Sequence, residues 1–161
     1  MPSEFRMVHR VEFADTDLAG IMHFANFFRL MERTEHAFFR SLGTSIHTTV
    51  DGTAIGWPRV RATCEYRQPL RFEDEVEVQL RVREKKPRAV TYDFTFRLAG
   101  QEVARGSMTA VCVSLDREAG RMRAVTIPAA LSEQLEAWAV GATSDQSDQS
   151  DQSDEPDDTL G

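Results

Sequence analysis

The apolar positions between residues 23 and 42 repeat every three or four residues, the spacing of one face of an α-helix. Six residues carry this stripe and three further apolar residues widen it. They are Phe24, Phe27, Phe28, Met31, Phe38 and Leu42, with Leu30, Ala37 and Phe39 beside them. Gly43 follows at once, and glycine commonly ends a helix. We therefore expect one long helix from near His23 to Leu42, with much of its circumference buried.

Around this helix the pattern changes to an alternation of apolar and polar residues, which predicts half-buried β-strands. The alternating runs cover residues 5–13, 60–66, 76–82 and 90–96, and a β-branched stretch covers 103–115. The sequences at 86–88 and 99–101 are typical of hairpin turns. Residues 128–140 predict a short closing helix, because Pro128 suits a first helical turn.

The order of these elements is strand, long helix, four strands and short helix. One long helix cannot cover both faces of such a sheet. The economical arrangement is an α+β fold in which an antiparallel sheet wraps around the helix and keeps its polar residues outside. A length of 161 residues fits a single domain with its own core, which we assign to residues 1–140.

The charge is unevenly distributed along the chain. The sequence has 26 acidic and 19 basic side chains, a formal net charge of −7. Residues 141–161 hold seven of the acids and no base, so the rest of the chain is formally neutral. This segment contains the repeat SDQSDQSDQSD and cannot bury enough apolar surface to offset its ordering entropy, so we expect a disordered acidic tail. A neutral body gives no indication of a nucleic-acid-binding surface.

Several other classes of protein find no support. No apolar run approaches the roughly 20 residues of a membrane span, and the first ten residues lack the apolar core of a secretory signal. Cys64 and Cys112 lie far apart in apolar or β-branched runs, as buried thiols of a reducing compartment do. We expect a cytoplasmic protein without a metal site or a bound cofactor.

The candidate chemistry lies between the first strand and the long helix, in the sequence DTDLAGIMHFAN from Asp15 to Asn26. A helix start offers unpaired backbone N–H groups and a partial positive charge, which can stabilise an oxyanion. A carboxylate folded over that end could attack a carbonyl or deprotonate a water. The parts for acyl transfer are then present, although the same aspartates also suit turn and capping roles.

Two blocks of sequence resemble a known family. Val11 to Ile21, then residues 25–29 and Glu32, are similar to the opening of hotdog-fold acyl-CoA thioesterases of the 4-hydroxybenzoyl-CoA thioesterase-like branch. That branch includes the Tol–Pal-associated acyl-CoA thioesterases. Residues 57–60 and 66–76 resemble the family's strand, proline turn and following strand, and the likeness covers roughly residues 5–127.

The resemblance implies a hotdog fold, an active site at a dimer interface, and a homodimer or homotetramer. It implies hydrolysis of a small or aromatic, short-to-medium acyl-CoA. The catalytic carboxylate is then Asp17, as nucleophile or general base, and the oxyanion donor is the backbone N–H of Phe24. His23 is kept as a candidate catalytic side chain, with a structural role as the alternative, and Asp15 is assigned a structural role.

The resemblance also suggests where the substrate binds. The motif residues Gly20 and Ile21 and the helix residues Phe27 and Phe28 are candidates for the acyl pocket. Coenzyme A phosphates meet basic residues near the turn between the middle strands, where this chain offers Arg83, Lys85, Lys86 and Arg88. A solvated hairpin tip is the alternative for that cluster.

Other possibilities remain open from the sequence. Glu32 and Glu35 on the long helix are reserve candidates for the catalytic carboxylate. An acyl-CoA- or acyl-carrier-protein-binding hotdog protein without hydrolytic activity is the alternative function, and a hotdog dehydratase is a weaker one.

Overall fold

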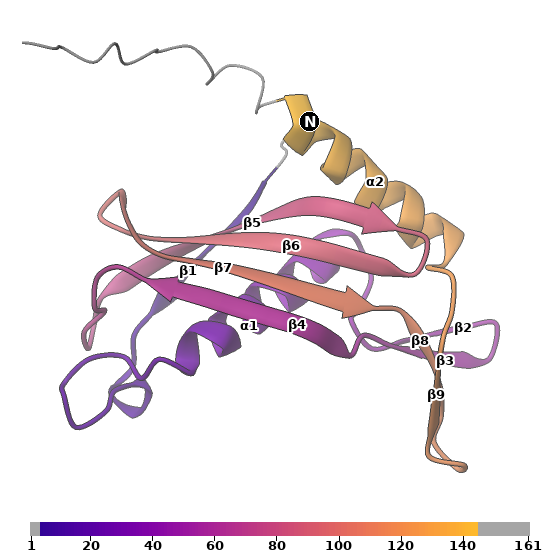
Figure 1. The fold of residues 1–161 in the computed structure, drawn as a ribbon, viewed down its shortest axis with the longest axis horizontal. Coiled ribbons are helices and arrows are strands. Elements are labelled where there is room, and N and C mark those ends of the chain that lie inside the picture. Colours follow the sequence, from indigo (N-terminus) through magenta and orange to yellow (C-terminus); the bar gives the residue numbers. More distant parts are fainter. Residues whose placement is uncertain (1–3, 145–161) are drawn as a thin grey trace, which may run out of the picture.

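The main feature of the fold is a five-stranded antiparallel sheet. The computed structural model describes residues 4–144. The strands lie in the order β1-β5-β6-β7-β4 (Figure 1). Their bounds are Phe5–Arg10 for β1, Arg59–Tyr66 for β4, Glu75–Lys86 for β5, Ala89–Leu98 for β6 and Gln101–Val111 for β7. The sequence pattern therefore predicts all five strands, although the first ends at Arg10 rather than at residue 13 because residues 13–15 form a short 3₁₀ helix. The two hairpin turns fall at Pro87–Arg88 and Ala99–Gly100.

A second, smaller sheet was not expected from the sequence. It contains β2 (Thr48–Val50), β3 (Thr53–Gly56), β8 (Val113–Asp116) and β9 (Arg121–Ala124), in that order. The stretch predicted as one strand from 103 to 115 breaks at Cys112, whose N–H donates to the Arg88 carbonyl oxygen at 2.8 Å. After this break the chain leaves the main sheet and pairs with β3 instead.

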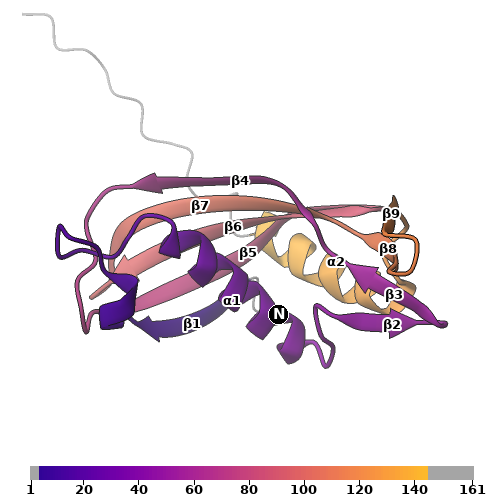
Figure 2. The same ribbon diagram turned by 90° about the horizontal axis from the view of Figure 1, so that it is seen from below.

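The long helix, α1, spans Asn26–Ser41 and lies across one face of the main sheet (Figure 2). Its apolar stripe faces the sheet, as the spacing of the sequence predicts, and Phe38, Phe39 and Met31 are fully buried. Gly43 ends the helix in the left-handed conformation, with φ of 75°. The helix begins three residues later than His23, where we expected it, because residues 23–25 form a turn before it.

Close contact between α1 and the sheet depends on a glycine. Gly106 of β7 faces Met31, whose Sδ would lie 2.8 Å from a side-chain carbon placed on Gly106. A larger residue there would force the end of the Met31 side chain to move. An antiparallel sheet with the long helix across one face confirms the predicted α+β hotdog fold.

The closing helix, α2, spans Ala129–Ser144 and packs beside β5 (Figure 1). Trp138 meets Phe38 of α1 edge to face, with ring centroids 5.1 Å apart. The helix continues four residues beyond the predicted end, and the rest of the predicted acidic tail, 145–161, lies outside the described residues. Within residues 4–144, no helix is long and apolar enough to span a membrane, and no three potential ligand side chains converge on a metal site.

Candidate active site

Asp17 is held in a tight loop immediately before α1. Its backbone N–H donates to the Ile21 carbonyl oxygen, and its own carbonyl accepts from the Gly20 N–H, both at 3.0 Å. Gly20 has φ of 74°, a conformation that glycine adopts without strain. The side-chain oxygen Oδ1 accepts from the Ala19 N–H at 2.8 Å. Within residues 4–144 no hydrogen bond engages the second oxygen, Oδ2, which leaves it available for chemistry.

The start of α1 presents an unpaired backbone donor. The N–H groups of the next three residues are all engaged: Ala25 donates to His23 Nδ1, Asn26 to the His23 carbonyl and Phe27 to the Phe24 carbonyl. The Phe24 N–H has no acceptor within the described part of the chain. Because this donor lies at the positive end of the helix, it is suited to receive a developing negative charge.

The Asp17 loop and the helix start enclose one cavity. Its volume is about 420 Å³, within the usual range for small-molecule sites. Asp17, Ile21, Phe24 and Phe27, all predicted from the sequence, line it together. The apolar side chains Met22 and Pro69 complete much of the wall. The residue with the available carboxylate and the residue with the unpaired amide thus line the same largely apolar cavity.

A second part of the cavity wall was missed by the sequence analysis. It is formed by Tyr66, Arg67, Gln68 and Pro69, at the end of β4 and in the connection to β5. The Met22 N–H donates to the Leu70 carbonyl at 2.7 Å and holds this connection against the Asp17 loop. The resemblance covered these residues, but only as a mark of the fold.

Three other candidates are absent from the cavity wall: His23, Gly20 and Phe28. The exposed His23 ring stacks on Phe24 with centroids 4.5 Å apart, and its Nδ1 accepts from the Ala25 N–H at 3.2 Å. His23 therefore stabilises the turn before α1, and Gly20 acts through the turn of the loop. Asp15 has the structural role assigned to it, because its Oδ2 accepts from the Glu12 N–H at 2.9 Å.

The predicted phosphate-binding cluster lies far from this cavity within one chain. Asp17 is near the Glu75 end of β5, whereas Lys86 is at the other end of this 12-residue strand. At about 3.3 Å per residue the two ends are about 35 Å apart. Lys85 pairs with Glu136 of α2 at 2.6 Å, and Lys86 with Glu84 at 3.4 Å. The four basic residues therefore do not join Asp17 in a single protomer.

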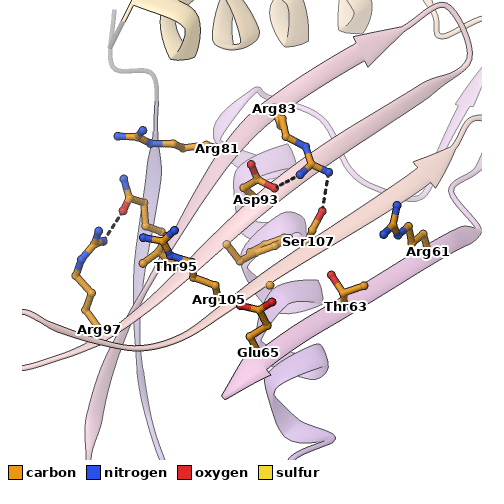
Figure 3. Close-up of a pocket in the computed structure, with 13 residues that line it drawn as sticks. Arg61, Thr63, Glu65, Arg81, Arg83, Asp93, Thr95, Arg97, Arg105 and Ser107 are labelled. Atoms are coloured by element: carbon orange, nitrogen blue, oxygen red, sulfur yellow. Dashed lines mark hydrogen bonds and ion pairs between the residues drawn. The ribbon is translucent and has the colours of Figure 1, made fainter. Parts of the chain in front are cut away.

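Arg83 points into a different hollow on the outer face of the sheet, the face opposite α1 (Figure 3). This hollow measures about 970 Å³ and carries five arginines: Arg61, Arg81, Arg83, Arg97 and Arg105. Arg83 contacts Asp93 at 3.1 Å and Ser107 at 3.0 Å, while Arg97 donates to Gln79. The hollow is larger than the candidate site, but four of its five arginines, Arg81, Arg83, Arg97 and Arg105, are engaged with neighbouring polar groups. It does not include Asp17 or Phe24.

Neither reserve glutamate lies in the cavity. Glu35 follows the start of α1 by nine residues, about 13 Å along the helix axis. Its side chain is fully buried and pairs with Arg59 of β4. Burial raises the pKa of Glu35 to about 7 and outweighs the attraction of Arg59. Glu32 is exposed and is absent from the cavity wall. Glu35 thus belongs to the interior of the fold.

The fold is that of a thioesterase. The chain belongs to the thioesterase-like superfamily, whose family model matches residues 11–135. Its activity is accordingly that of a thioester hydrolase.

Characterised proteins of this kind resemble the chain over most of its length. A 1,4-dihydroxy-2-naphthoyl-CoA hydrolase from Synechococcus sp. (strain WH7803) is 25% identical over 150 residues, covering 89% of this chain and 95% of that protein. A gentisyl-coenzyme A thioesterase structure has a TM-score of 0.70 and 30% identity, and the match covers 79% of this chain and 98% of that one. A 4-hydroxybenzoyl-CoA thioesterase in complex with 4-hydroxybenzoyl-CoA shares the fold, with a TM-score of 0.70, 21% identity and coverage of 83% and 99%.

The buried Glu35 makes stability depend on pH. Its pKa is about 7 in the folded chain against an ordinary value of 4.5, so the folded state binds the proton more tightly. The free energy of unfolding should therefore fall as pH rises from about 4.5 to about 7, by roughly 1–3 kcal/mol from this group. Denaturant unfolding between pH 4.5 and 8 should show this decrease in the wild type and a flatter profile in Glu35→Gln. Parallel profiles for the two proteins would contradict the assignment.

Proposed function

We propose that this protein hydrolyses an acyl-CoA thioester in the cavity between the Asp17 loop and the start of α1. The observation that carries the proposal is the pairing of an available carboxylate with an unpaired helix-start amide in one largely apolar pocket. The family to which the chain belongs supports the same chemistry.

In the proposed reaction the thioester carbonyl oxygen accepts from the Phe24 N–H. Asp17 Oδ2 then attacks the carbonyl carbon, or takes a proton from a water that attacks it. The carbonyl π electrons move to the oxygen, whose negative charge the amide and the helix dipole stabilise. Collapse of this intermediate breaks the carbon–sulfur bond and releases coenzyme A thiolate. In the nucleophilic route, water then cleaves the acyl-aspartyl anhydride, so both routes consume one water and require no cofactor.

The pocket fits an aromatic or a short-to-medium acyl group. Phe24, Phe27 and Tyr66 offer aromatic faces and edges on which a ring packs well, and a cavity of about 420 Å³ holds a small acyl group. The relatives named above act on dihydroxynaphthoyl and gentisyl thioesters, both aromatic. We therefore propose an aromatic acyl-CoA as the first substrate to test.

We also propose a cytoplasmic location, since both cysteines are free thiols.

Replacing Asp17 should abolish turnover without unfolding the protein. The Asp17→Asn variant keeps the side-chain oxygen that accepts from Ala19 but loses the reactive carboxylate, so kcat should fall at least 100-fold. Thiol release from a panel of aromatic and aliphatic acyl-CoAs measures this, with thermal denaturation as the control for folding. Near wild-type turnover in the variant would refute the role of Asp17. Binding of acyl-CoA without thiol release by the wild type would favour the non-hydrolytic alternative.

Two substitutions at Phe24 distinguish the contribution of its backbone N–H from that of its phenyl ring. Phe24→Pro deletes the N–H, whereas Phe24→Ala keeps it and deletes the ring. We expect kcat to fall about 100- to 1000-fold in the proline variant, the usual effect of losing one oxyanion donor. The alanine variant should mainly raise KM. Equal kcat values in two folded variants would show that the amide takes no part in the reaction.

We further propose that two copies associate through β4. This strand pairs with β7 on one side, and on the other side residues 4–144 offer it no partner. Such an edge readily pairs with another chain, and the apolar Val60 on it is 65% exposed. If two β4 strands pair antiparallel, the Arg59 end of β4 in one copy lies beside the Tyr66 end of β4 in the other. The β5–β6 turn of the second copy, with Lys86 and Arg88, then lies at the same end of the joined sheet as Asp17, where coenzyme A phosphates could meet it.

A charge at Val60 should break this assembly. Val60→Glu places a carboxylate in the proposed contact, so light scattering should report a smaller particle than for the wild type. Met122 of β9 is 63% exposed and offers a matched control, because Met122→Glu adds the same charge outside β4. An unchanged mass for Val60→Glu, or the same loss of mass in both variants, would argue against association through β4.

A further inference from the structure

Tyr66, the last residue of β4, is joined to the start of α1 by a hydrogen bond. Its hydroxyl donates to the Phe24 carbonyl oxygen at 3.1 Å. The same oxygen accepts from the Phe27 N–H at 3.3 Å, within the first turn of the helix. The N–H and the carbonyl of Phe24 belong to the two peptide units that meet at its α-carbon. A hydrogen bond to the carbonyl therefore limits rotation of the Phe24 backbone and, through it, the range of directions open to the unpaired N–H.

Ring packing fixes the position of the Tyr66 hydroxyl. The Tyr66 ring meets Phe27 edge to face with centroids 4.9 Å apart, and Phe27 in turn packs against Phe96 of β6 at 5.2 Å. Phe27 is buried and Phe96 is fully buried. The phenol is therefore supported by the core, although Tyr66 itself is 45% exposed and lines the cavity.

The hydroxyl remains a hydrogen-bond donor at working pH. Burial, together with the neighbouring Cys64 thiol, raises the pKa of Tyr66 to about 12. Because the Phe24 carbonyl oxygen can only accept a hydrogen bond, this bond exists only while the Tyr66 phenol is protonated.

We infer that Tyr66 is a positioning residue for thioester hydrolysis: its hydroxyl fixes the Phe24 carbonyl and so helps to hold the Phe24 backbone with its N–H directed into the cavity beside Asp17. The inference rests on the proposed function and extends it, because it links the end of an edge strand to the oxyanion donor. Neutral hydrogen bonds make modest contributions, so the expected effect is smaller than that of losing the donor itself.

The chain supplies a matched control for the test, since it contains two tyrosines. Tyr66→Phe removes the hydroxyl that binds Phe24. Tyr92→Phe makes the same change in the core, where the Tyr92 hydroxyl is buried and has no hydrogen-bond partner within the described residues. Both variants keep the aromatic ring and should melt close to the wild type, because neither change opens a cavity.

Steady-state thiol release should show a three- to tenfold lower kcat for Tyr66→Phe, with KM changed less than twofold, and wild-type values for Tyr92→Phe. The loss should disappear when Tyr66→Phe is added to Phe24→Pro, because the amide to be positioned is then absent. A wild-type kcat for Tyr66→Phe would overturn the inference. So would a raised KM at constant kcat, which marks a substrate contact. An inactive wild-type protein would instead refute the proposed function.

Discussion

The start of α1 is the constraint around which this molecule is built. The Phe24 N–H lies in the turn that leads into α1, two residues before the helix begins, and it remains unpaired in the cavity that Asp17 also lines. Three hydrogen bonds from the surroundings hold the segment before and at the start of α1 in place. Met22 is hydrogen-bonded to Leu70, the Asn26 side chain to the Asp15 carbonyl, and Phe24 itself to Tyr66. A site with so few chemical groups depends on how firmly each is oriented.

Two aspartates two residues apart illustrate how local geometry divides roles. The Asp15 carboxylate accepts a hydrogen bond from the Glu12 N–H in a short 3₁₀ turn. The Asp15 backbone carbonyl accepts hydrogen bonds from the His23 N–H and from the Asn26 side-chain amide. Asp17 uses one carboxylate oxygen for the loop and keeps the other available. The first aspartate thus shapes the loop, and the second lines the cavity.

The sequence alone predicted most of the fold because its signals are local. Helical spacing of the phenylalanines and alternation in the strands correctly give α1 and the five-stranded sheet. The small second sheet was not predicted, because strands of three or four residues are too short to show an alternation of apolar and polar residues. The start of α1 was misplaced because the His23 ring accepts the Ala25 N–H and holds that stretch in a turn.

The site was predictable only where its residues are close in sequence. Asp17 and Phe24 belong to one motif, whereas Tyr66 lies 42 residues from Phe24 and meets it only through the sheet topology. Nor does the sequence show at which end of the sheet Arg83 to Arg88 lie.

Isotope-edited infrared spectroscopy of a bound aromatic acyl-CoA, labelled at its thioester carbonyl carbon, would test the account most directly. In the Asp17→Asn variant, which preserves the substrate, the carbonyl stretch should shift to lower frequency than in water, because the Phe24 N–H and the helix dipole polarise it. The shift should be lost when Phe24→Pro is added. A carbonyl frequency in the bound state equal to that in water would contradict the central role of the α1 start.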